Sequence, residues 1–173
     1  MSIKKLKIIS VIGIFLLSFF VHYGYELLPC FITSIFFPIN ESLFEHMKLI
    51  STCYLLWSII EYKILENKNN FKSNLIISII FNILIFLLMF YPIYLNFKHN
   101  LIITLLIYLL SIIITQVLSY HILNLKKTLF LNKIFYFFIV ILVLINTIFT
   151  YNPLNNNFFI DYMNKKIGFS NYY

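Results

Sequence analysis

Long apolar runs constrain this chain more than any other feature of its sequence. Five of them, separated by short polar stretches, cover residues 6–28, 43–62, 75–94, 101–123 and 134–151. A helix needs about 20 mainly apolar residues to cross a bilayer. The runs therefore predict an all-α integral membrane helical bundle with about five transmembrane helices. They place residues 1–173 in a single transmembrane domain, in which residues 152–173 form a polar C-terminal tail.

The composition points to the lipid bilayer as the principal partner of this chain. Apolar residues make up 61 % of it and charged residues only 11 %, too few charges to cover the surface of a water-soluble fold. The net charge of +7 comes from lysine alone. These lysines are spread singly between apolar runs and form no basic face, which argues against a nucleic acid as partner.

The distribution of lysines predicts an orientation. With five spans, nine of the 13 lysines fall on one side, in the N-terminal segment and in the loops after the second and fourth spans. Cytoplasmic loops retain lysine and arginine. We therefore expect a multi-pass protein of the cell membrane, the plasma membrane, with its N-terminus cytoplasmic and its C-terminus extracytoplasmic. The other side then holds Lys48, Lys98, Lys165 and Lys166.

The first run has a basic start, as a signal peptide does, but no small-x-small cleavage site follows it. It is interpreted as a retained first span that ends at Pro29, because proline lacks the amide donor that continues a helix. Residues 29–39 are apolar but too short to cross, which is typical of an interfacial or re-entrant segment.

The polar residues gather in one stretch, residues 38–48, which holds two carboxylates, a histidine and a lysine. Ser42 and Glu45 have the S-x-x-E spacing that opens a helix. On that helix, Glu41, Glu45 and Lys48 share one face at 100° per residue. An ionised side chain that faces lipid costs about 2.5–3.5 kcal/mol or more at the bilayer centre. This face is therefore expected to meet water, headgroups or other protein groups.

The first span offers a partner for that face. Ser18, His22 and Glu26 follow one another at intervals of four residues and form a single stripe on a helix. With the predicted topology, both polar faces lie on the outer side. Together they define a candidate polar cluster of His22, Glu26, Asn40, Glu41, Ser42, Glu45, His46 and Lys48.

Three hypotheses for this cluster stay open at the level of sequence. It is a structural or ligand-binding network in which the charges neutralise one another, or a relay for protons or ions in a small transporter. The third hypothesis is a divalent-metal site, with His22, Glu26, Glu41, Glu45 and His46 as ligands. Such a site would make the chain a membrane-embedded metal-dependent hydrolase. No zincin pattern, nucleophile elbow or phosphate-binding glycine loop is present, so the sequence names no reaction.

Other polar residues have simpler interpretations. Asn82, Gln116 and Asn146 lie inside apolar runs and are expected to form hydrogen bonds between helices. Glu61 lies at the inner end of the second span, where interface placement or a contact with Tyr120 and His121 is expected. Cys30 and Cys53 lack C-x-x-C spacing. They are interpreted as small apolar side chains, and a disulfide between them is the alternative.

Two segments carry a resemblance to a known family. His22, Tyr25 and Glu26, followed by residues 38–49, resemble the signature H-x-x-Y-E … F-x-P-V-N-E-S-x-W-E-H-x-K-L of an uncharacterised family of small bacterial membrane proteins. Ile39 and Phe44 replace the usual valine and tryptophan. The ending, residues 149–169, is also similar to that of the family. The resemblance implies a multi-span membrane protein and brings no established activity with it.

Overall fold

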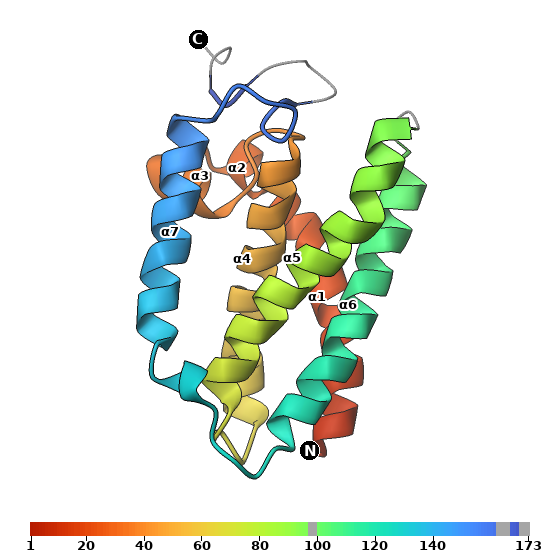
Figure 1. Cartoon of the computed structure of the whole chain (residues 1–173), viewed down its shortest axis with the longest axis vertical. Coiled ribbons are helices and arrows are strands. Elements are labelled where there is room, and N and C mark those ends of the chain that lie inside the picture. The colour runs from red at the N-terminus through yellow and green to blue at the C-terminus, as the bar shows by residue number, and fades with distance from the viewer. Residues whose placement is uncertain (97–99, 162–166, 170–173) are drawn as a thin grey trace. The chain divides into compact units, whose positions relative to one another are not determined.

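The computed structural model describes residues 1–96, 100–161 and 167–169. About 75 % of these residues are helical, which confirms the predicted all-α class. The helices, labelled in Figure 1, are α1 (Ile3–His22), α2 (Gly24–Leu27), α3 (Phe31–Phe36), α4 (Leu43–Ile64), α5 (Phe71–Asn96), α6 (Leu101–Leu123), the 3-10 helix η1 (Phe130–Asn132) and α7 (Phe135–Tyr151). Three lysines assigned to the outer side lie outside the described residues: Lys98, Lys165 and Lys166.

Three of these helices support a membrane location. α1, α6 and the part of α5 over Phe71–Ile93 are long and apolar enough to cross a bilayer. Their apolar side chains also face outward, as Phe20 and Leu88 do with 74 % and 71 % of their surface exposed. α4 has 22 residues but is less apolar, and α7 is shorter, with 17 residues. The division into five spans, including α4 and α7, stays a prediction.

The first helix ends earlier than the sequence predicts. α1 stops at His22, and α2 begins separately after Tyr23. Gly24 starts α2 at a close approach: a Cβ atom on it would lie 2.5 Å from the ring of Phe37. The expected stripe through Ser18, His22 and Glu26 therefore does not run along a single helix, because Glu26 belongs to α2.

The chain forms two compact units. Unit 1 contains residues 1–17 and 54–135. Within it α5 packs along α6 (Figure 1). The Asn82 amide donates to the hydroxyls of Tyr54 at 3.2 Å and of Thr115 at 3.1 Å, and Gln116 lies 3.5 Å from the same Tyr54 hydroxyl. The expected interhelical hydrogen bonds of Asn82 and Gln116 are thus confirmed.

Unit 2 contains residues 18–53 and 136–173. The segment after α7, predicted as a polar tail, folds back in its described part. The Phe158 carbonyl accepts a hydrogen bond from the backbone N–H of Phe44 at 3.1 Å. The rings of Phe44, Phe149 and Phe159 also pack against one another, with centroids 5.1 to 5.7 Å apart. These aromatic residues bury enough apolar surface to hold the segment against α4.

Candidate functional site

The start of α4 is built by the stretch singled out in the sequence. The Asn40 side chain accepts a hydrogen bond from the N–H of Ser42 at 3.0 Å, and the Ser42 hydroxyl accepts one from the N–H of Glu45 at 3.4 Å. In a capping box the glutamate would return to the N-cap backbone. Here the Glu45 carboxylate instead accepts from the N–H of Ile39 at 3.0 Å. The carboxylate thereby fixes the chain after Pro38 as well as the start of the helix.

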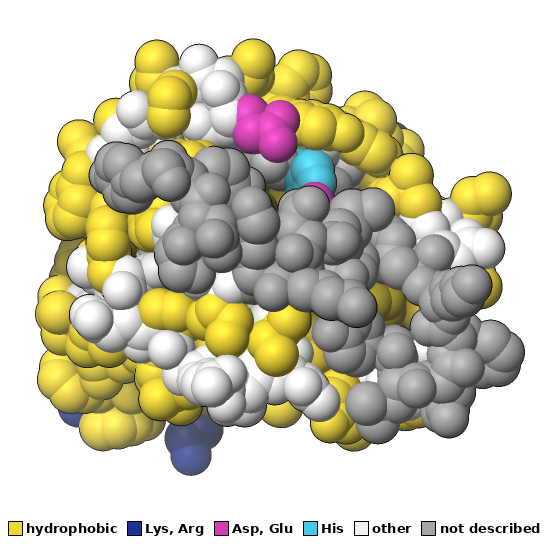
Figure 2. Space-filling model, turned by 90° about the horizontal axis from the view of Figure 1, so that it is seen from above, with side chains coloured by type: hydrophobic (Ala, Val, Ile, Leu, Met, Phe, Trp, Pro, Cys, Tyr) yellow, Lys and Arg dark blue, Asp and Glu magenta, His cyan; other side chains and the backbone are white. Residues whose placement is uncertain are grey.

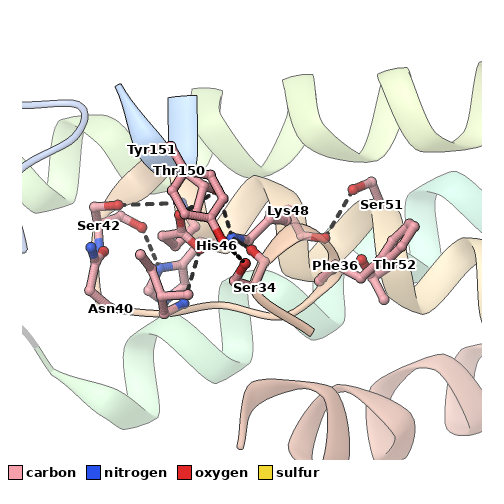
Figure 3. Close-up of polar contacts among 12 residues, drawn as sticks. Ser34, Phe36, Asn40, Ser42, His46, Lys48, Ser51, Thr52, Thr150 and Tyr151 are labelled. Atoms are coloured by element: carbon pink, nitrogen blue, oxygen red, sulfur yellow. Dashed lines mark hydrogen bonds and ion pairs between the residues drawn. The ribbon is translucent and has the colours of Figure 1, made fainter. Parts of the chain in front are cut away.

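Beneath this cap lies a buried network of Ser34, Glu45, Lys48 and Thr150 (Figure 3). The Lys48 ammonium is 2.5 Å from the Glu45 carboxylate, and the two residues are only 1 % and 2 % exposed. It also donates to the Ser34 carbonyl at 2.8 Å and to the Thr150 hydroxyl at 3.0 Å. An ammonium group has three N–H donors, so each donor of Lys48 has an acceptor.

The network ties three helices of unit 2 together. Ser34 comes from α3, Glu45 and Lys48 from α4, and Thr150 from α7, where the Thr150 hydroxyl lies 3.5 Å from Glu45. A second bond, 2.8 Å long, joins the hydroxyls of Ser34 and Tyr151. Lys48, which the sequence counts among the lysines of the outer side, is buried within the protein. Its ammonium pairs inside the protein because the carboxylate three residues earlier lies on the same helix face.

A second group, the His–Glu–His triad, consists of His22, Glu41 and His46. His22 Nε2 lies 3.0 Å from one Glu41 carboxylate oxygen, and His46 Nε2 lies 3.7 Å from the other. The imidazole centroids are 6.3 Å apart. His46 Nδ1 is 2.9 Å from the Ser42 carbonyl, which can only accept, so this nitrogen carries a proton.

The triad is open to the outside, in contrast to the network beneath it. The side chains of His22 and Glu41 keep 30 % and 26 % of their surface exposed, and that of His46 keeps 12 %. Figure 2 shows histidine and carboxylate side chains together at one face of the molecule. A carboxylate and two imidazoles at this surface can exchange hydrogen bonds and charge with a molecule that arrives from outside.

The predicted cluster therefore separates into three parts. Asn40, Ser42, Glu45 and Lys48 form the cap and the buried network, and His22, Glu41 and His46 form the triad. Glu26 is exposed on α2 and belongs to neither group, although its charge acts on His22.

The metal-site hypothesis gains no support from this geometry. Within residues 1–96, 100–161 and 167–169, no group of three or more His, Cys, Asp or Glu side chains is arranged to hold a metal ion. Glu45, one of the five predicted ligands, is committed to the Lys48 ammonium in the buried network.

Three residues of unit 2 contribute to the site although the sequence does not predict it: Ser34, Thr150 and Tyr151. For Thr150 and Tyr151 a signal existed, since they lie in the second segment that carries the family resemblance. The structure joins the two segments, because the Lys48 ammonium donates directly to the Thr150 hydroxyl. Ser34 offers no such signal, because it contributes to Lys48 through its backbone carbonyl.

The two cysteines of unit 2 differ in environment and form no disulfide. Cys30 is exposed between α2 and α3, whereas Cys53 is buried in α4. A hydrogen bond from the Thr33 hydroxyl lowers the pKa of the Cys30 thiol. A lowered pKa raises the thiolate fraction, so Cys30 is the more reactive of the two.

Comparison with known proteins assigns the chain to a family. Neither the curated proteins nor the solved structures contain a match to it. A family model described as "Family of unknown function (DUF6512)" matches residues 1–169, a range that includes the cap, the buried network and the triad. The chain belongs to this family of unknown function.

Proposed function

We propose that this membrane protein binds a small organic cation, an ammonium-bearing molecule, at the His–Glu–His triad. The observation that carries the proposal is the contrast in exposure between two adjacent groups of charges. The Glu45–Lys48 pair is completely buried, whereas Glu41 stays partly open between two imidazoles. The lysine distribution supports an extracytoplasmic position for this site.

The charges of unit 2 favour a cation over an anion. Among the described residues of this unit, Lys48 is the only lysine, and its charge is balanced by Glu45. The partly exposed carboxylate of Glu41 and the exposed carboxylate of Glu26 add negative charge to this surface. Such a surface raises the local concentration of cations. The oxygens of Glu41 are acceptors that an ammonium group, which only donates, can use.

The buried network contributes rigidity to the proposed site. It fixes α3 and α7 against the start of α4, the helix that carries His46. The cap fixes the chain just before that helix, where Glu41 lies. A binding group that is held in place before the ligand arrives loses less conformational freedom on binding. Network and triad thus have separate roles, one structural and one in recognition.

The test uses ethanolamine, which is protonated at neutral pH, as the probe. Nuclear magnetic resonance signals of the imidazole Cε1–Hε1 groups would be followed at constant pH in detergent-solubilised protein, with His22→Gln and His46→Gln variants for assignment. We expect saturable shifts of both signals and no response to ethylene glycol, a neutral molecule of similar size.

Glu41→Gln removes the negative charge and should abolish the response to ethanolamine. Glu66→Gln is the matched control, because Glu66 is exposed and belongs to unit 1, and it should respond as the wild type does. Shifts that do not saturate, or that persist in Glu41→Gln, would show that the triad is not a cation site.

A further inference from the structure

Unit 1 contains a buried ion pair of its own. The Lys7 ammonium on α1 lies 2.8 Å from both carboxylate oxygens of Glu61 on α4, and the Ser10 hydroxyl donates to the same carboxylate at 2.5 Å. Lys7 and Glu61 are only 4 % and 5 % exposed. The sequence counts Lys7 among the lysines of the inner side and predicts for Glu61 interface placement or a contact with Tyr120 and His121. It does not predict that the two residues form a buried pair with each other.

A cavity adjoins the pair. Lys7 and Glu61 line it together with residues of α4, α5 and α6. Its other polar lining side chains are Tyr54, Trp57, Asn74, Ser78, Gln116 and Ser119. All of these residues belong to unit 1. A cavity with so many polar groups differs from the apolar voids that remain dry in protein interiors.

Five of the lining side chains carry a buried polar atom that has no hydrogen-bond partner within the described part of the chain. These atoms are Trp57 Nε1, Asn74 Oδ1, Ser78 Oγ, Gln116 Oε1 and Ser119 Oγ. Leaving one buried polar group unsatisfied costs about 1–3 kcal/mol. Five such costs around one cavity are comparable with the whole stability of a typical domain, about 5–15 kcal/mol. A dry cavity is therefore disfavoured.

The size and chemistry of the cavity select its occupant. The volume open to the centre of a water molecule is about 10 Å³, which is near the lower limit for one buried water and too small for an organic molecule. Trp57 Nε1 needs an acceptor, Asn74 Oδ1 and Gln116 Oε1 need donors, and hydroxyls accept either. A bare cation cannot serve the indole and an anion cannot serve the amide oxygens, whereas water both donates and accepts and so suits each kind of group.

We propose that this cavity is an internal water site that hydrates the Lys7–Glu61 ion pair within the helices of unit 1. A bound water makes about three hydrogen bonds, so it joins some of the orphaned polar atoms of α4, α5 and α6 to the charged pair. It also gives Lys7 and Glu61 a hydrogen-bonded route for proton exchange that a dry ion pair lacks. This site is independent of the His–Glu–His triad, which lies in unit 2.

The test exploits Trp57, the only tryptophan of the chain. With ¹⁵N-labelled tryptophan the protein gives a single indole N–H signal, and its contact with water is read from a cross-peak to the water resonance. We expect that cross-peak in the wild-type protein. Its absence would overturn the proposal, and this measurement needs no variant to fold.

Two serines of α6 provide a matched pair of variants. Ser119 lines the cavity and has an unpartnered hydroxyl, whereas Ser111 is equally buried but donates to the Tyr108 carbonyl at 2.7 Å. In a hydrated cavity, Ser119→Ala should weaken the water cross-peak, shift the Trp57 emission to the blue and lower the unfolding temperature. Ser111→Ala should leave the cross-peak and the emission unchanged.

The sign of the stability change distinguishes water from an empty cavity. If the cavity is dry, Ser119→Ala removes an unsatisfied polar group and the unfolding temperature rises. A rise with no change in the Trp57 emission would overturn the proposal as clearly as a missing cross-peak in the wild-type protein.

Discussion

The two buried ion pairs of this protein are chemically alike but differently surrounded. Glu45 and Lys48 lie three residues apart on one helix, and neighbouring groups complete their hydrogen bonds. Lys7 and Glu61 lie 54 residues apart in sequence and border a cavity with unpartnered polar atoms. Desolvation of a charge costs several kcal/mol, which is repaid only when geometry and hydrogen bonds are good.

The difference suggests different roles for the two pairs. The Glu45–Lys48 pair obtains good geometry and its hydrogen bonds from protein groups alone, as we expect of a structural link among α3, α4 and α7. Lys7–Glu61 relies on Ser10 and, by our proposal, on water, so its protons can reach other groups. A satisfied pair makes a rigid element, whereas a hydrated pair can change its charge state. The variants below test this contrast, beginning with the largest expected effect.

Lys48→Met should be the most damaging single substitution. It leaves Glu45 buried without its counter-ion in a place that water does not reach, and removing one partner of a buried pair costs about 3–5 kcal/mol. Thermal unfolding in detergent should show a large fall in the unfolding temperature. Lys63→Met, on the exposed last turn of the same helix, is the control and should change little.

Two additional measurements check that interpretation. Glu45→Leu combined with Lys48→Met removes both charges and should recover most of the loss, because an apolar pair carries no desolvation cost. In a Cys30→Ser background, buried Cys53 reports on unit 2: maleimide should label it faster after Lys48→Met but not after Lys7→Met. A double variant as unstable as the single one would contradict the assigned role of the network.

Lys7→Met should cost less than Lys48→Met although the buried area is similar. Glu61 would keep its bond from Ser10, and cavity water would solvate the carboxylate oxygen that Lys7 leaves, so we expect a loss nearer the roughly 1–3 kcal/mol of an unsatisfied group. Unfolding temperatures measured beside those of exposed Lys5→Met give the comparison. A loss equal to that of Lys48→Met would mean that the two pairs are equally dry.

The contrast between the pairs also shows what sequence alone could predict. The all-α class and the helix that begins near Ser42 follow from apolar runs and a capping pattern, and both are local properties. Glu45 and Lys48 were placed on one helix face for the same reason. Their burial was not foreseen, because it depends on Ser34 and Thr150, which tertiary packing brings from two other helices.

The features that the sequence did not predict all depend on distant contacts. Helical periodicity cannot pair Lys7 with Glu61, and each residue looked like an ordinary charge at the end of a span. The sequence does not predict the end of α1 at His22, because a helical pattern continues beyond it. The close approach of Phe37 to Gly24 comes from tertiary packing, which a sequence pattern does not show. The folded ending was missed because its asparagines outweighed Phe158 and Phe159 in the composition.

Thr150→Val should have a moderate effect on unit 2. The side chains have nearly the same shape, so the change removes the hydroxyl that accepts from Lys48 and leaves packing almost intact. A net loss of about 1 kcal/mol is expected for one hydrogen bond, somewhat more because the donor is charged. Thr147→Val, one turn earlier on α7 with a hydroxyl bonded only within its own helix, is the control for the same measurement. Equal losses would show that the Thr150 hydroxyl contributes nothing special to the network.

Glu41→Gln should have the smallest effect on stability, although it should abolish cation binding. The carboxylate is partly exposed, and exposed ion pairs contribute about 0–1 kcal/mol because water solvates the charges when the partner is lost. Glutamine keeps an oxygen that can accept from His22, so the unfolding temperature should stay close to that of the wild type. A fall as large as that of Thr150→Val would show that the triad is a structural part of the network. An unchanged temperature together with a lost ethanolamine response would separate recognition at the triad from support by the buried pair.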